Sequence, residues 1–126
     1  MSSQTEPRIL FTRGEIAAAV RRLSAEIDRD YRGRCPLLVG ILKGSFVFMA
    51  DLVRSLAFPL EVEFIKLSSY GRVRESSGKV RVVKGLTSPV KGRDVLVVED
   101  IVDTGITLSF LLDYLKKKKP ASLRLC

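Results

Sequence analysis

Residues 97–107 read Val-Val-Glu-Asp-Ile-Val-Asp-Thr-Gly-Ile-Thr, and the stretch changes character along its length. It opens inside a predicted strand, residues 94–98, which is apolar after Asp94 in the way typical of a strand buried on both faces of a sheet. It continues through acids and small hydroxyl residues, after which leucines at positions 108, 111, 112 and 115 recur at the spacing of one helix face. The stretch therefore predicts a strand, then a polar loop, then the start of a helix.

Strand and helix patterns alternate before this stretch as well. Residues 12–30 have helical apolar spacing, with Thr12 as a candidate N-cap and an apolar face that comprises Ile16, Val20, Leu23 and Ile27. An apolar strand is predicted at residues 37–42. A helix follows and ends before Pro59, with an apolar face at helical spacing that comprises Phe46, Met49, Ala50, Val53 and Ala57.

The remaining segments complete the same pattern. Residues 60–67 first alternate apolar and charged positions, which indicates a strand nearer an edge of the sheet. Residues 68–79 form a long polar loop, interpreted as a lid, and a short strand returns at 80–83. We expect a doubly wound parallel α/β sheet with flanking helices, truncated within the strand that begins at Ser122. One domain, residues 12–126 and incomplete at its C-terminus, follows a polar tail at residues 1–11.

Composition narrows the class of protein. The chain has 126 residues and a formal charge of +8, which fits a phosphorylated or polyanionic partner or simply a soluble surface. The lysines at positions 116–119 close a predicted helix and are interpreted as a solvated cap, so nucleic acid is not the expected partner. Two cysteines and no apolar leader or membrane-spanning run predict a cytoplasmic protein that is not in a membrane.

Polar residues follow the predicted strands where ligands bind in doubly wound sheets. Glu99 and Asp100 could orient sugar hydroxyls and help to hold Mg²⁺, or could merely mark the end of a strand. Gly105 permits close backbone approach, and the helix start with its threonine hydroxyls could bind a phosphate. Asp103 could be an N-cap or could exchange a proton with a base. At the other strand end, Lys43 could be a solvated turn residue.

Residues 97–107 resemble the PRPP-binding motif of the type I phosphoribosyltransferases. The resemblance implies that Glu99 and Asp100 meet the ribose hydroxyls and Mg²⁺, and that Asp103 acts as the general acid/base at purine N7. It also implies that the 5′-phosphate is wrapped by a continuous run, namely Asp103, Thr104, Gly105, Ile106, Thr107 and Leu108. Ile106 stands where relatives carry varied residues, including lysine, so backbone groups and hydroxyls are expected to bind the phosphate.

Two further segments resemble hypoxanthine-guanine members of this family. Residues 40–46, followed by 49–52, resemble their pyrophosphate loop, which implies that Lys43 and Gly44 hold pyrophosphate and that the Leu42–Lys43 peptide is cis. Residues 68–71 resemble the tip of their mobile loop, with Ser69 and Tyr70 as its serine and tyrosine.

The resemblance covers residues 12–126 and implies an activity. A bacterial-type member would transfer phosphoribose from PRPP to hypoxanthine or guanine, giving IMP or GMP and pyrophosphate, as a homodimer or homotetramer. In relatives a later segment supplies a lysine, an aromatic residue and an acid around the base, and these have no counterpart here, so the chain is interpreted as a fragment. The alternatives are a non-catalytic nucleotide-sensing regulator, an inactive fragment, or a different nucleotide-binding domain with a similar motif by chance.

Overall fold

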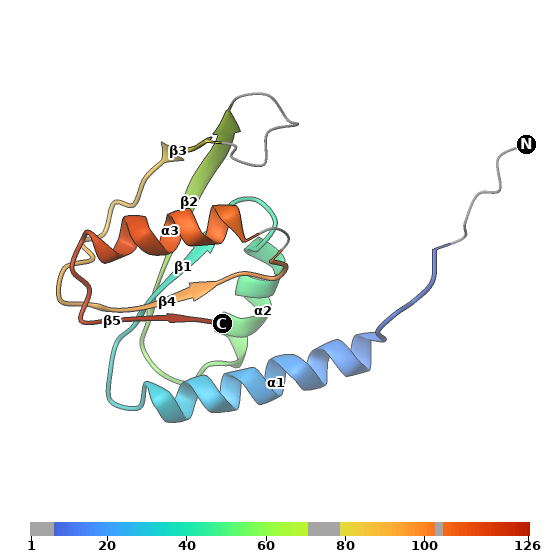
Figure 1. Ribbon diagram of the computed structural model, residues 1–126. Helices are drawn as coiled ribbons and strands as arrows, with labels where there is room; N and C mark the ends of the chain where they lie inside the picture. Colours follow the sequence, from blue (N-terminus) through green and yellow to red (C-terminus); the bar gives the residue numbers. More distant parts are fainter. Residues whose placement is uncertain (1–6, 71–78, 103–104) are drawn as a thin grey trace, which may run out of the picture.

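A computed structural model describes residues 7–70, 79–102 and 105–126 and shows a five-stranded sheet between helices (Figure 1). The elements in chain order are α1 (Arg13–Asp30), β1 (Leu37–Ile41), α2 (Phe46–Ser55), β2 (Glu61–Tyr70), β3 (Lys79–Lys84), β4 (Asp94–Val98), α3 (Ile106–Lys116) and β5 (Ser122–Leu125).

The sheet has the strand order β3-β2-β1-β4-β5. β1 lies in the centre and pairs in parallel with both β2 and β4, and β5 pairs in parallel with β4. β3 is an antiparallel edge strand beside β2, which makes the sheet mixed while leaving its core parallel. The predicted α/β class is therefore confirmed, and β2 lies next to an edge as its alternating sequence indicates.

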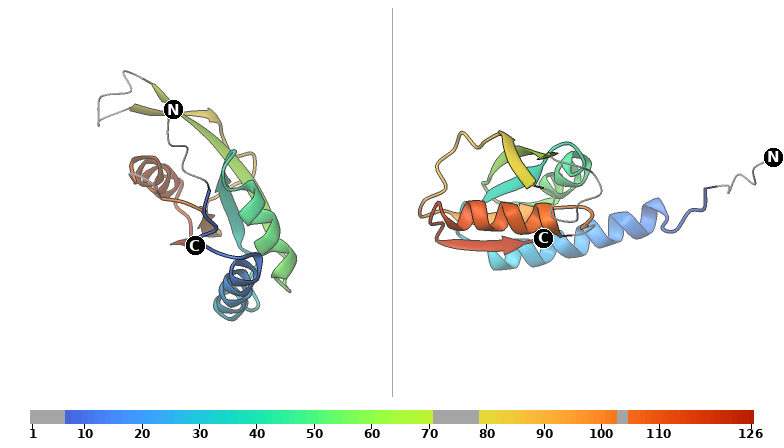
Figure 2. Two further views of the ribbon diagram at one scale, coloured as in Figure 1. Left: turned by 90° about the vertical axis from the view of Figure 1, so that its right-hand side faces the viewer. Right: turned by 45° about the horizontal axis from the view of Figure 1, so that its top comes forward.

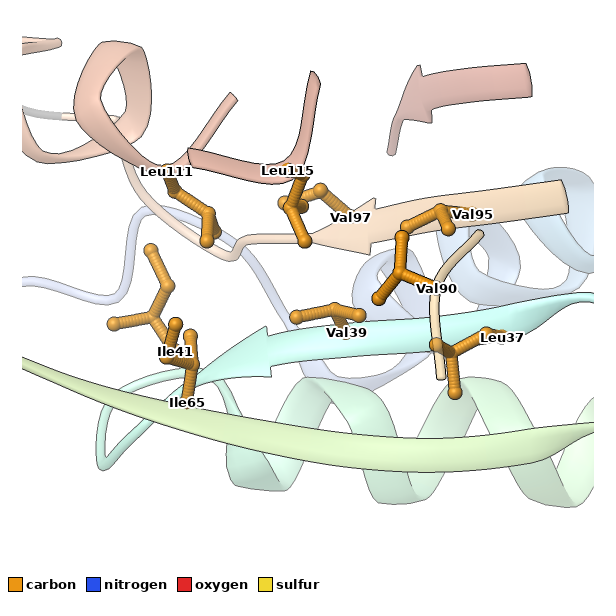
Figure 3. Close-up of a cluster of buried hydrophobic side chains, with 9 residues drawn as sticks. All are labelled: Leu37, Val39, Ile41, Ile65, Val90, Val95, Val97, Leu111 and Leu115. Atoms are coloured by element: carbon orange, nitrogen blue, oxygen red, sulfur yellow. The ribbon is translucent and has the colours of Figure 1, made fainter. Parts of the chain in front are cut away.

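Strand residues alternate between two apolar layers, one on each face of the sheet. Leu37, Val39 and Ile41 of β1 pack with Leu111 and Leu115 of α3, as the close-up in Figure 3 shows. The intervening residues of β1 and β4 face the opposite layer, which α1 and α2 cover (Figure 2). Burial on both faces explains why β1 and β4 are apolar at nearly every position.

The start of α1 is fixed by local chemistry. Thr12 Oγ1 accepts a hydrogen bond from the Glu15 backbone N–H, and Glu15 Oε1 accepts one from the Thr12 N–H. This reciprocal capping box satisfies two backbone donors that the helix itself leaves unpaired. The predicted cap is confirmed, but Ile16 is 52% exposed. The first part of α1 runs past the edge of the sheet, so this residue has no core to pack against (Figure 1).

Two other expectations are corrected by the tertiary structure. α2 buries Met49 and Leu52, whereas Phe46 is exposed, because the helix turns a different face to the sheet than its apolar spacing indicated. The segment expected to be a loop from residue 68 begins as strand, since β2 continues to Tyr70. Its backbone groups pair with β3, a non-local contact that the polar sequence does not reveal.

One buried carboxylate joins β2 to the segment that precedes β4. Glu63 Oε1 accepts hydrogen bonds from Thr87 Oγ1 at 2.7 Å and from the Ser88 N–H at 2.8 Å. These hydrogen bonds lower the pKa of Glu63 to about 2, even though its burial acts in the opposite direction. The contact fixes the path of the chain between β3 and β4, and Val90 of this segment enters the core.

Candidate functional site

The two loops with unusual sequence emerge side by side at one edge of the sheet. β1 and β4 are adjacent parallel strands in register from Leu37–Val95 to Gly40–Val98, so the residues after each strand leave from the same edge. A methyl group placed on Gly44 would lie 3.7 Å from Asp100 Oδ1. The fold therefore brings the glycine of the first loop against an acid of the second.

The loop after β1 is held at both ends by backbone hydrogen bonds. The Leu42 N–H donates to the Ile65 carbonyl of β2 at 2.9 Å, and the Phe46 N–H donates to the Lys43 carbonyl at 3.2 Å. The Leu42–Lys43 peptide is cis, as the family resemblance implies. The side chain of Lys43 is exposed, and within the described residues it has no acidic partner in an ion pair. Its charge is therefore available to an anion.

Glu99 and Asp100 form a tight local arrangement at the end of β4. The Asp100 N–H donates to Glu99 Oε1 at 3.1 Å, and the Ile101 N–H donates to Asp100 Oδ1 at 2.9 Å. Glu99 is half-buried, and its own N–H donates to the Cys126 carbonyl of the chain beyond β5. Burial, together with the neighbouring Asp100 carboxyl, raises the pKa of Glu99 to about 7. No described cation forms an ion pair with either acid.

The start of α3 differs from the start of α1. Its N-cap is Gly105, with φ of 81° in the left-handed region, and glycine itself has no side chain with which to cap the helix. Glycine adopts this conformation without the steric cost that a Cβ atom adds. The Ser109 N–H donates to the Gly105 carbonyl at 2.8 Å, which closes the first helical turn. The first turn of a helix carries the positive end of the helix dipole, a usual feature of an anion site.

A hollow of about 380 Å³ lies between Glu99, the start of α3 and the end of β2, and Asp100 is not part of its lining. Its lining combines polar and apolar groups: Ser69, Glu99, Ile101, Val102, Gly105, Thr107 and Leu108. Five residues named from the sequence thus share one cavity, with Ser69 reaching it from the last part of β2. Ile106 is not part of this lining and is partly exposed at 39%.

Two lining residues were not singled out from the sequence. Ile101 and Val102 are 74% and 52% exposed although both are apolar. They lie directly after a buried strand, so their apolar character resembles a continuation of that strand. The sequence feature that could have marked them as site residues is their position between the acids and the glycine, where apolar side chains have no core to enter.

Some of the predicted site residues lie outside the described ranges. Asp103 and Thr104 fall between residues 102 and 105, and the side chain of Tyr70 is likewise not described. Over the described residues, no group of three or more potential metal-ligating side chains gathers in one place. A larger hollow of about 530 Å³ lies between α1 and α2, but no described residue of the loop after β1 or of the loop after β4 lines it. Its charged rim includes Arg54, which forms an ion pair with Asp51.

Comparison with known proteins agrees with this arrangement. Residues 9–126 match the phosphoribosyl transferase domain. The chain is 41% identical over 118 residues to hypoxanthine-guanine phosphoribosyltransferase of Bacillus subtilis, covering 94% of this chain and 66% of that protein. It is 45% identical over 118 residues to the bifunctional protein TilS/HprT of Listeria monocytogenes serotype 4b, covering 94% of this chain and 18% of that protein.

A solved structure supports the same relationship. The hypoxanthine-guanine phosphoribosyltransferase of Bacillus anthracis superposes with a TM-score of 0.89 at 39% identity, covering 95% of this chain and 71% of that chain. The present chain spans less than two thirds of the length of the Bacillus subtilis and Listeria relatives, with 66% and 18% of those proteins covered. The match of residues 9–126, together with the superposition, establishes that the chain belongs to the phosphoribosyl transferase domain family.

Proposed function

We propose that the chain is the PRPP-binding part of a purine salvage transferase that moves phosphoribose from PRPP to hypoxanthine or guanine. The products would be IMP or GMP and pyrophosphate. The observation that carries the proposal is the approach of Gly44, after β1, to Asp100 in the loop after β4, whose Ile101 and Val102 line the hollow at the start of α3. A diphosphate group and a sugar phosphate need binding groups on either side of one ribose, and these two loops supply them. Relatives named hypoxanthine-guanine phosphoribosyltransferase support the choice of base.

The pyrophosphate end of PRPP is assigned to the loop after β1. Lys43 and Gly44 would bind the leaving group, because the lysine charge is unpaired among the described residues and glycine lets backbone groups approach closely. Negative charge grows on the pyrophosphate as its bond to ribose C1′ weakens. A positioned cation and backbone donors stabilise that charge most where water is excluded.

The phosphate end is assigned to the start of α3. Residues 103–108 would wrap the 5′-phosphate, with Gly105 and Thr107 contributing from the described part of the hollow. Asp103 is proposed to hold the proton at purine N7, a role that depends on a carboxylate at the reaction centre. Ile101 and Val102 would cover an apolar face of the base, because they are exposed within the same hollow.

Magnesium fits the donor groups that the site offers. Glu99 and Asp100 provide carboxylate oxygens, which Mg²⁺ prefers, and the described chain places no cation beside them. Mg²⁺ commonly binds through one or two carboxylates and completes its coordination with water and substrate phosphate oxygens. We therefore assign these two acids to the metal and to the ribose hydroxyls. When bound, the ion would neutralise charge on the diphosphate.

The assembled protein is proposed to be a homodimer or homotetramer of the cytoplasm. An apolar hollow of about 360 Å³ between α2 and β2 supports association, since Phe46 is 55% and Val62 is 37% exposed at its rim. Among α1, α2 and α3 of the described chain, none has both the length and the apolar composition to span a bilayer. Sedimentation equilibrium tests the proposed oligomer. A monomeric mass that does not change with concentration at micromolar protein would contradict it.

Two assays run in parallel test the proposed reaction. Calorimetric titration with PRPP and Mg²⁺ measures binding, and the absorbance change on conversion of hypoxanthine to IMP measures turnover. Saturable binding with turnover supports the transferase. Binding without turnover would favour a nucleotide-sensing regulator or a chain that lacks part of its base site. Absence of both would contradict the proposal.

A further inference from the structure

Ser45 is a buried hydroxyl at the end of the loop that carries Lys43 and Gly44. Its side chain has no solvent exposure, and Oγ donates to the Ile41 carbonyl at 2.7 Å. The Ser45 backbone N–H donates to the same carbonyl at 3.3 Å. The side chain and the backbone of Ser45 therefore both donate to the last residue of β1, which holds the ends of the loop together just before α2 begins.

Gly40 provides the space for this hydroxyl. A Cβ atom on Gly40 would lie 2.8 Å from Ser45 Oγ, closer than Cβ atoms come to other heavy atoms, and 3.0 Å from Met49 Cε, tighter than most Cβ contacts. Gly40 is the penultimate residue of β1, and its partner in β4 is Val98, the residue before Glu99. The absence of a side chain on Gly40 thus leaves room for the Ser45 hydroxyl beside the strands from which both halves of the site emerge.

A bond of this kind can be a local feature of a helix and nothing more. Serine side chains often donate to the carbonyl four residues earlier, and Ser55 does so to the Asp51 carbonyl at 3.2 Å in the same helix. Ser55 is exposed at the far end of α2, however, and its bond spans only helical residues. The Ser45 bond is buried and spans the loop, where a desolvated hydroxyl without its acceptor would be costly.

We propose that Ser45 is a positioning residue for pyrophosphate binding: its hydroxyl fixes the backbone of Lys43 and Gly44 at the distance from Asp100 that the ligand requires. The inference rests on the proposed function, because it assumes that this loop binds pyrophosphate. It adds a residue that contacts no ligand and acts through the loop alone. A loop held in place binds more tightly than one that must be ordered by its ligand.

The test is calorimetric titration of the chain with inorganic pyrophosphate and magnesium. Ser45→Ala should raise the dissociation constant roughly tenfold, below the ~100-fold effect that a misplacement of about 1 Å can cause. Ser55→Ala, which removes the matched bond in the same helix, should leave affinity unchanged. Ile27→Val, a core change distant from the loop with a similar expected loss of stability, should also leave it unchanged.

Each outcome distinguishes the inference from the proposed function. If the unsubstituted chain does not bind pyrophosphate, the proposed function fails and the inference fails with it. If that chain binds and Ser45→Ala binds equally well, only the inference is overturned. If Ser45→Ala and Ile27→Val lose the same amount of pyrophosphate affinity, Ser45 has only a structural role, and the inference is overturned. Should Ser45→Ala not fold, Ser45→Cys keeps a weak donor, and a partial loss of affinity is expected, whereas full affinity would contradict the inference.

Discussion

Replacement of Glu63 by glutamine should destabilise the fold in a way that depends on pH. In the folded chain, hydrogen bonds from the side chains and backbone around Ser88 and Thr87 lower the pKa of Glu63 from 4.5 to about 2. At about 1.36 kcal/mol for each pH unit, the ionised carboxylate contributes roughly 3 kcal/mol to the free energy of unfolding at neutral pH. Glu63 is 8% exposed but lies on β2, next to the edge strand, so solvent screening makes roughly 3 kcal/mol an upper limit.

The sign of the pH dependence follows from the direction of the pKa change. Because folding lowers the pKa of this acid, its stabilisation is complete above about pH 4.5 and is lost as the pH falls towards about 2. Glu63→Gln should therefore lower the free energy of unfolding by roughly 2 to 3 kcal/mol at pH 7, since the amide keeps one acceptor. The difference between the two proteins should shrink steadily between about pH 4.5 and about pH 2.

Urea unfolding followed by far-UV circular dichroism measures this difference, since the chain has no tryptophan to report by fluorescence. Glu61→Gln is the matched control on the same strand. Its side chain is 51% exposed and lies 3.3 Å from Arg93 in an ion pair, so its loss should cost less than about 1 kcal/mol. A Glu63→Gln difference that stays constant from pH 7 to pH 2 would refute the reasoning.

Other substitutions test the core and the site. Leu115→Ala should lower the free energy of unfolding by about 2 to 5 kcal/mol, measured by urea unfolding, because the side chain is fully buried; a loss below about 1 kcal/mol would contradict the packing. Gly44→Ala should fold normally, because the added methyl group would lie at an ordinary 3.7 Å from Asp100, yet calorimetry should show pyrophosphate binding at least roughly tenfold weaker, and unchanged binding would argue against the loop. In the whole protein, Asp103→Ala should lower turnover far more than PRPP affinity, and weaker binding with unchanged turnover would rule out its proton-transfer role.

The central strands could be predicted because their burial leaves a direct mark on the sequence. β4 is buried on both faces from Val95 to Val98, so this apolar run marked all of the observed strand except its first residue, Asp94. The helix faces were harder to predict. Ile16 has core spacing but is exposed, since the first part of α1 lies beyond the sheet. Whether such a residue is buried depends on how far the neighbouring strands and helices extend. The periodic pattern of one helix does not carry that information.

The candidate site divides in the same way. The proximity of Gly44 to Asp100 follows from strand order, because parallel neighbouring strands end at one edge. The hydrogen bonds of Glu63 were not predictable, since they come from Thr87 and Ser88 in a segment that the sequence does not pair with β2. The Ser45 hydrogen bond is local, but the burial of its hydroxyl depends on tertiary packing that the sequence does not reveal. Ser69 was expected at the tip of a loop, but it reaches the hollow from β2 because pairing with β3 extends that strand.

The central claim is that the loop after β1 and the acids after β4 bind PRPP together. Calorimetric titration with PRPP and Mg²⁺ tests it most directly, using Lys43→Ala, Asp100→Asn and, as a control in the hollow between α1 and α2, Arg21→Ala. The account predicts one saturable site in the unsubstituted chain, weakened at least roughly tenfold by either site substitution and unaffected by Arg21→Ala. Binding that survives both site substitutions, or that only Arg21→Ala removes, would contradict the account.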